Sequence, residues 1–94
     1  MSSGNLRNEL IRIEREIKIY RKNDSEIIRE INIDSIDFNI IIEIVPPPED
    51  DPLLYEGHIL NENQLIKFNH YLQEPINPNF DLYFYVLECT GIYK

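Results

Sequence analysis

The feature that most constrains the fold is a pair of neighbouring segments in which isoleucine alternates with polar residues. Over residues 10–21 the isoleucines stand at odd positions, and the alternation resumes over residues 26–33 after the turn-rich segment 22–25. A period of two residues is typical of a half-buried strand, so we predict a β-hairpin. Arg15 is the exception, because it falls among the apolar positions. A helix is the alternative for the first segment, since a stripe of helical spacing also runs through it: Leu6, Leu10, Ile13, Ile17 and Tyr20.

Residues 36–45 suit either a helix or a strand. Asp34 or Ser35 can cap a helix N-terminus, and Pro46 would end the helix. The sequence between them is rich in β-branched isoleucine, which suits a buried strand equally well. We predict the helix, because a capping residue precedes the segment.

A second helix is predicted after a stiff connector. Residues 46–52 read PPPEDDP, and because proline lacks a backbone N–H, this acidic segment should be exposed. Asn61 and Gln64 have the spacing of a capping box, and Pro75 should end the helix that follows. The apolar face of this helix carries Leu65, Phe68 and Leu72.

The last strand, residues 82–87, is apolar on both faces, which suits a central strand or a strand with one face at an interface. The elements therefore follow the order ββααβ, with room for a short fourth strand at residues 57–60. We predict a two-layer α+β fold, in which an antiparallel three- to four-stranded sheet carries two helices on one face. Residues 1–9 are expected to form an N-terminal tail and residues 10–94 a single α+β domain.

Three motifs of the second half resemble those of a family of small, uncharacterised bacterial domains: DPLLY at residues 51–55, NENQ at residues 61–64 and LEC at residues 87–89. The family shares a hairpin, a short helix running into Pro and Asp-Pro, a Glu-containing helix start and an aromatic last strand. The resemblance covers about residues 13–89 and implies the same order of elements, including a helix before Pro46. It implies no catalytic residues, because the family carries no assigned activity.

The charge of the chain is large and unevenly distributed. Its 94 residues include 9 Lys and Arg against 17 Asp and Glu, a net charge of -8. Residues 1–33 sum to +1, whereas residues 34–94 sum to -9. Such a surface repels phosphates, so we expect no nucleic acid partner and instead a basic protein partner.

The sequence predicts a protein of the cytoplasm. The longest apolar run, residues 82–87, has six residues, far fewer than the roughly 18–20 that cross a membrane, so no membrane association is expected. The N-terminus lacks the apolar segment of a secretory signal, and the lone Cys89 cannot form an internal disulfide. Both observations fit a reducing compartment.

No residue pattern points to catalysis, a metal or a cofactor. His58, His70 and Cys89 lack the spacing of zinc ligands, and Cys89 is expected to pack in the core. The three glycines do not form a phosphate-binding loop. We therefore predict no catalytic residues, no metal and no cofactor.

Two groups of residues are candidates for partner binding. Glu49, Asp50 and Asp51 place three carboxylates on the stiff connector, where they can steer a cationic partner and accept arginine. Tyr83 and Tyr85 alternate with Phe84 on the last strand. We expect Phe84 to point into the core and the two tyrosines to lie on the opposite face, where tyrosine suits an interface.

Two functional hypotheses follow from these residues. The first is a non-catalytic protein-binding domain, of the immunity or antitoxin type, that masks a basic partner such as a nuclease. The second is a small ligand-binding domain or enzyme with a carboxylate-lined pocket and His58 or His70 as the proton carrier. An uncovered sheet face would also allow a homodimer.

Overall fold

The two alternating segments pair as the sequence predicts. In the computed structural model, which describes residues 10–93, β1 (Leu10–Arg21) runs antiparallel to β2 (Ile27–Asn32). Asp24 stabilises the turn between the strands, because its carboxylate accepts the N–H of Glu26 and pairs with Arg21. The predicted hairpin is therefore confirmed.

The sheet has four antiparallel strands in the order β2-β1-β4-β3. The last strand, β4 (Tyr83–Tyr93), pairs with β1 along most of its length and is longer than the predicted residues 82–87. On its other side β4 pairs with the two-residue strand β3 (His58–Ile59). The chain therefore follows the order ββαβαβ rather than the predicted ββααβ. The additional strand, β3, lies within residues 57–60, where the sequence allows a short fourth strand.

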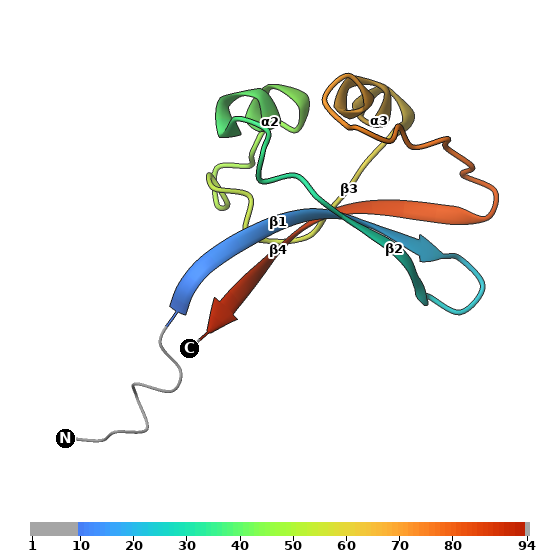
Figure 1. The fold of residues 1–94 in the computed structure, drawn as a ribbon, viewed down its shortest axis with the longest axis horizontal. Coiled ribbons are helices and arrows are strands. Elements are labelled where there is room, and N and C mark those ends of the chain that lie inside the picture. Colours follow the sequence, from blue (N-terminus) through green and yellow to red (C-terminus); the bar gives the residue numbers. More distant parts are fainter. Residues whose placement is uncertain (1–9, 94) are drawn as a thin grey trace.

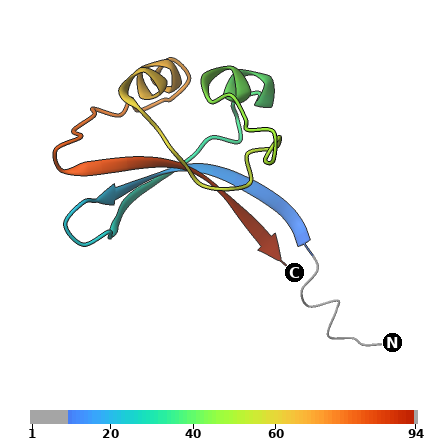
Figure 2. The ribbon, with the colours of Figure 1, turned by 180° about the vertical axis from the view of Figure 1, so that it is seen from behind.

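Both helices cover the same face of the sheet, as Figures 1 and 2 show from opposite sides. Their bounds are α2, Phe38–Ile44, and α3, Glu62–Asn69. The other face of the sheet is left uncovered by the described elements. The structure is thus the two-layer α+β arrangement that the sequence predicts.

The first helix begins later than predicted. Its N-cap is Asp37, whose side chain accepts the N–H of Asn39 at 2.8 Å. The predicted cap, Asp34, is engaged elsewhere, since its carboxylate accepts the N–H of Arg15 at 3.0 Å and the Asn32 amide at 3.1 Å. The β-branched residues are accommodated because the helix buries its isoleucines against the sheet: Ile41 and Ile44.

The second helix has the predicted capping box but ends before Pro75. Asn61 accepts the N–H of Gln64, and the Gln64 side chain accepts the N–H of Asn61, each at 2.9 Å. The helix stops at Asn69, whose side-chain amide bonds both backbone groups of Ile76 at 2.8 and 2.9 Å and so turns the chain. Leu72, expected on this helix, packs on the core from the segment that follows it.

The core lies between the sheet and the two helices. Ile17 and Leu87 face each other across β1 and β4, and Phe68 of α3 packs with them in the same buried cluster. Arg15, the exception in the alternation, also faces the helix layer. Its guanidinium lies over the ring of Phe38, 4.6 Å from the centroid, and donates to the carbonyl of Leu53 at 2.7 Å. Aromatic and carbonyl groups therefore replace part of the water around this cation, while its buried Nε has no hydrogen-bond partner among residues 10–93.

None of the helices within residues 10–93 is both long enough and apolar enough to cross a membrane.

Candidate functional site

The uncovered side of the sheet carries a connected group of charged and aromatic side chains, which we call the open face. These side chains come from even positions of β1, from the β2 residue that pairs with Lys18, and from alternate positions of β4. Its members are Glu16, Lys18, Tyr20, Glu30, Phe84, Val86, Glu88 and Thr90.

Lys18 lies at the centre of the open face. Its ammonium is 3.4 Å from a carboxylate oxygen of Glu88, 3.6 Å from Glu30 and 4.0 Å from Glu16. Burial acts to lower the pKa of Lys18, but the attraction of these carboxylates, led by Glu88, outweighs it and raises the pKa. The cluster therefore combines one fixed positive charge with three negative charges.

Two of the carboxylates stand directly opposite each other. Glu16 of β1 pairs with Glu88 of β4, so their side chains leave neighbouring strands on the same face. Like charges in this position repel, and the ammonium of Lys18, which lies within 4.0 Å of both carboxylates, counters that repulsion. Thr90 donates its hydroxyl to Glu16 at 3.2 Å, which holds that carboxylate in place. The open face thus keeps an excess of negative charge at fixed positions.

An aromatic pair borders the carboxylates. The rings of Tyr20 and Phe84 stack with their centroids 5.0 Å apart and their planes inclined by 7°. The Tyr20 hydroxyl donates a hydrogen bond to Glu88. This hydrogen bond, burial and the neighbouring negative charge raise the pKa of Tyr20 to about 12.

The raised pKa of Tyr20 gives a testable prediction. Its folded pKa of about 12 exceeds the usual 10.0, so the stabilisation from neutral Tyr20 is present below pH 10.0 and is lost as the pH rises through about 12. In an ultraviolet titration of the phenols, the difference between the wild type and Tyr20→Phe should be one group that titrates near pH 12. Glu88→Gln should move that group towards pH 10.0, and an unchanged titration in Glu88→Gln would contradict the assigned hydrogen bond.

The connector carboxylates have different environments. Glu49 and Asp50 are exposed, as the sequence analysis expects. Asp51 is 7% exposed and belongs to the interior, so its interpretation as an accessible partner-binding residue is corrected. The sequence gives no sign of this difference, because all three carboxylates lie in the same acidic, proline-rich segment.

Asp51 organises the loop that leads to β3. Its two carboxylate oxygens accept the N–H groups of Tyr55 at 2.8 Å and Glu56 at 3.0 Å, and His58 Nε2 donates to it at 2.9 Å. Burial acts to raise the pKa of Asp51, but these hydrogen bonds outweigh it and lower the pKa. The same loop holds the buried Leu54 at φ 55°, a conformation that is costly for a residue with a Cβ. Asp51 therefore compensates for a strained loop.

The aromatic residues of β4 face opposite to the expectation. Tyr85 is 1% exposed in the core, where its hydroxyl accepts the N–H of Asn79 at 2.9 Å and its ring meets the edge of Phe80. Tyr83 is half-buried on the same side, packed against the core. Phe84 lies on the open face against Tyr20. The alternation of the strand is as predicted, but the two faces are exchanged because the helices cover the tyrosines.

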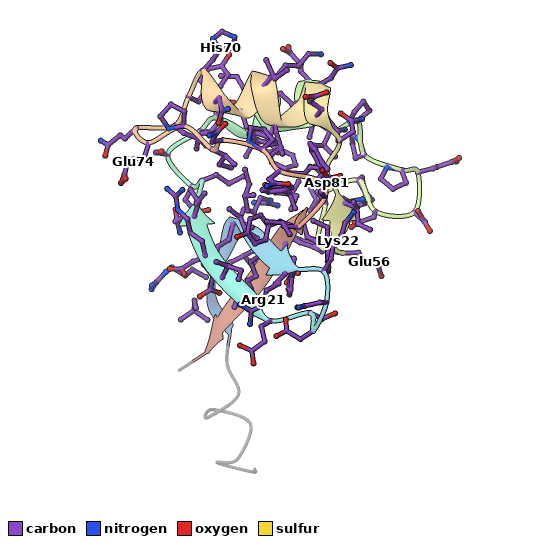
Figure 3. All side chains as sticks on the ribbon, turned by 90° about the vertical axis from the view of Figure 1, so that its right-hand side faces the viewer. Arg21, Lys22, Glu56, His70, Glu74 and Asp81 are labelled. Carbon is purple, nitrogen blue, oxygen red and sulfur yellow. The ribbon has the colours of Figure 1, made fainter. Side chains whose placement is uncertain are left out.

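The histidines and the cysteine lie apart from the open face. His58 is hydrogen-bonded to Asp51. His70 lies on the outer side of the helix layer in Figure 3 and borders a hollow of about 220 Å³ between α2 and α3. Burial raises the pKa of the Cys89 thiol, which disfavours a nucleophilic thiolate. No group of three or more His, Cys, Asp or Glu side chains within residues 10–93 is arranged to hold a metal ion.

The open-face residues were not singled out by the sequence analysis. A signal was available in the hairpin, because its polar positions must share one face once its isoleucines are assigned to the other. The partner Glu88 could not be found this way, since only the register of β4 against β1 places it opposite Glu16.

Comparison with known proteins supports the resemblance to a family of small domains without an assigned activity. The profile of a family described as Domain of unknown function (DUF7683) matches residues 14–88, close to the 13–89 over which the resemblance was expected. No curated protein and no solved structure matches the chain. Since the match spans most of the sequence, the chain belongs to the family described as Domain of unknown function (DUF7683).

Proposed function

We propose that the chain is a protein-binding domain that recognises a basic protein through its open face. The observation that supports this proposal is the arrangement of three carboxylates around one ammonium, with Glu16 and Glu88 directly opposite each other. One ammonium among three carboxylates leaves an excess of negative charge on the open face. A cation from a partner would balance this excess, and binding would gain Coulomb energy from it.

The neighbouring groups favour arginine as the cation that binds. A guanidinium can form two parallel hydrogen bonds to a carboxylate and can also stack on an aromatic ring. The open face offers both, because Glu30 is 50% exposed and the stacked rings of Tyr20 and Phe84 lie beside the carboxylates. Ile59, at 74% exposure next to Val86, adds an apolar contact at the edge of the face.

The net charge supports the same class of partner over longer distances. A charge of -8 attracts a basic protein and accelerates its association at low ionic strength. Immunity and antitoxin proteins that mask basic toxins work in this way, and we propose this type of role for the chain. The exposed Glu49 and Asp50 of the connector then serve as a second attractive region.

The proposal can be tested with two double variants that change the net charge equally. Glu16→Gln with Glu30→Gln neutralises the open face while leaving Lys18 paired with Glu88. Glu49→Gln with Asp50→Asn neutralises the connector. Tagged wild-type and variant proteins are used to capture partners from an extract of the native host at low and at high salt, followed by affinity measurement with the purified partner.

We expect the wild type and the connector variant to retain a basic protein at low salt and to release it at high salt. The open-face variant should bind that protein at least about tenfold more weakly, with a smaller dependence on salt. Equal binding by both variants, or loss in the connector variant alone, would contradict the open-face assignment. Retention of no basic protein by the wild type would overturn the proposed function itself.

A further inference from the structure

A pocket on the helix side of the sheet is large enough to hold a small molecule. Its volume is about 360 Å³, within the usual range for ligand pockets, and it lies between β2 and the segment that follows α3. Ile31 and Leu72, which pack on the core, form its apolar part. Its polar part comes from exposed side chains, among them Arg29, Ser35 and Glu74.

The pocket contains opposite charges that do not neutralise each other. Arg29 and Glu74 both line it, yet neither takes part in an ion pair within residues 10–93. Figure 3 shows Glu74 projecting from the segment after α3. The guanidinium of Arg29 offers donors for a carboxylate, and the carboxylate of Glu74 accepts an ammonium. One ligand that carries both charges would satisfy both residues.

Secondary structure holds the two sides of the pocket in place. Ile31 pairs with Ile17 in the hairpin, which fixes the position of the neighbouring Arg29 along β2. On the opposite side, Asn69 bonds both backbone groups of Ile76, which closes the segment containing Leu72 and Glu74 into a loop. The backbone of the pocket is therefore held in place before a ligand binds, and binding has to order the exposed side chains of Arg29 and Glu74.

We propose that this pocket binds a small zwitterion with an apolar side chain, namely a free hydrophobic α-amino acid. Arg29 binds its carboxylate, Glu74 binds its ammonium, and the side chain packs on Ile31 and Leu72. This site is separate from the open face, because the pocket lies on the helix side of the sheet. Binding there does not depend on the proposed recognition of a basic protein.

The test is an NMR titration of the ¹⁵N-labelled protein with L-leucine and L-phenylalanine as probes. We expect saturable shifts of the backbone amides of Asn32, Ser35 and Gln73. The corresponding amino acid amides, which lack the carboxylate, and the N-acetylated forms, which lack the ammonium, should each bind at least about tenfold more weakly. Arg29→Gln should weaken binding of the free amino acid by a similar factor, as should Glu74→Gln.

Matched controls distinguish the pocket from a general effect of charge. Arg12→Gln and Glu62→Gln remove the same charges at exposed positions outside the pocket and should leave the titration unchanged. The absence of saturable shifts up to about 10 mM of both probes would overturn the proposal. Equal affinity of the wild type and Arg29→Gln would also overturn it, because the assigned carboxylate partner would then be wrong.

Discussion

Replacing Phe68 with alanine should lower the free energy of unfolding by about 3–5 kcal/mol. Phe68 is 0% exposed and is among the largest fully buried side chains of the core. It is presented by a short helix, so the loss of its ring removes much of the contact between α3 and the sheet. A domain of this length has a total stability of roughly 5–14 kcal/mol, so the substitution removes between about a fifth and all of it. Urea unfolding followed by circular dichroism measures the loss.

Ile66 of the same helix provides the control. It is 50% exposed on the opposite side of α3, so Ile66→Ala should change the free energy of unfolding by less than about 1 kcal/mol. If Phe68→Ala does not fold, Phe68→Leu should fall between the wild type and the alanine variant, because it keeps part of the buried volume. Equal losses at positions 66 and 68 would contradict the placement of α3.

The second large effect is expected at Asp51. Asp51→Ala should lower the melting temperature at neutral pH by on the order of 10 °C, because it removes the acceptor for two backbone N–H groups and for His58. The two backbone N–H groups that follow the strained Leu54 would then lose their acceptor. Asp50→Ala is the matched control, since that neighbouring carboxylate is exposed and its replacement should leave the melting temperature nearly unchanged.

The effect of Asp51 should depend on pH with a defined sign. Its pKa in the folded protein lies below the usual 3.8, so the folded state favours the ionised carboxylate. The stabilisation is therefore fully present above pH 3.8 and is lost as the pH falls through the lower folded pKa. The melting temperatures of the wild type and Asp51→Asn should converge in acid. A constant difference between them from neutral pH down to about pH 2 would contradict this assignment.

Much of the fold could be predicted because its signals are local. The alternation of isoleucine in residues 10–21 and 26–33 predicts a hairpin, and the Asn61–Gln64 capping box predicts the start of α3. Where local signals competed, the prediction was less accurate. The start of α2 was misplaced because Asp34 forms its hydrogen bonds with β1 and β2 residues instead of capping the helix.

The candidate site could be predicted only in part. The connector carboxylates have identical sequence signals, yet Asp51 is buried and Asp50 is exposed, because only Asp51 lies where the turn brings backbone N–H groups to it. The alternation along β4 separates Tyr85 from Phe84 but does not say which face the helices cover. That choice depends on the register against β1, where Ile19 pairs with Tyr85.

The sequence by itself determined the hairpin, the second helix start, the strong negative charge and the α+β class of this protein. The charge depends on composition alone. The hairpin and the helix start depend on residues a few positions apart, whose periodicity and hydrogen-bonding capacity act before the chain is compact. Tertiary structure decided the short strand β3, the burial of Asp51 and the meeting of Glu16 with Glu88 on the open face. The pairing of β3 with β4 and of Glu16 with Glu88 joins residues far apart in the chain, so these contacts form only when the register of the sheet is set. The hydrogen bonds of Asp51 are local, but they form only once the loop has folded around its carboxylate.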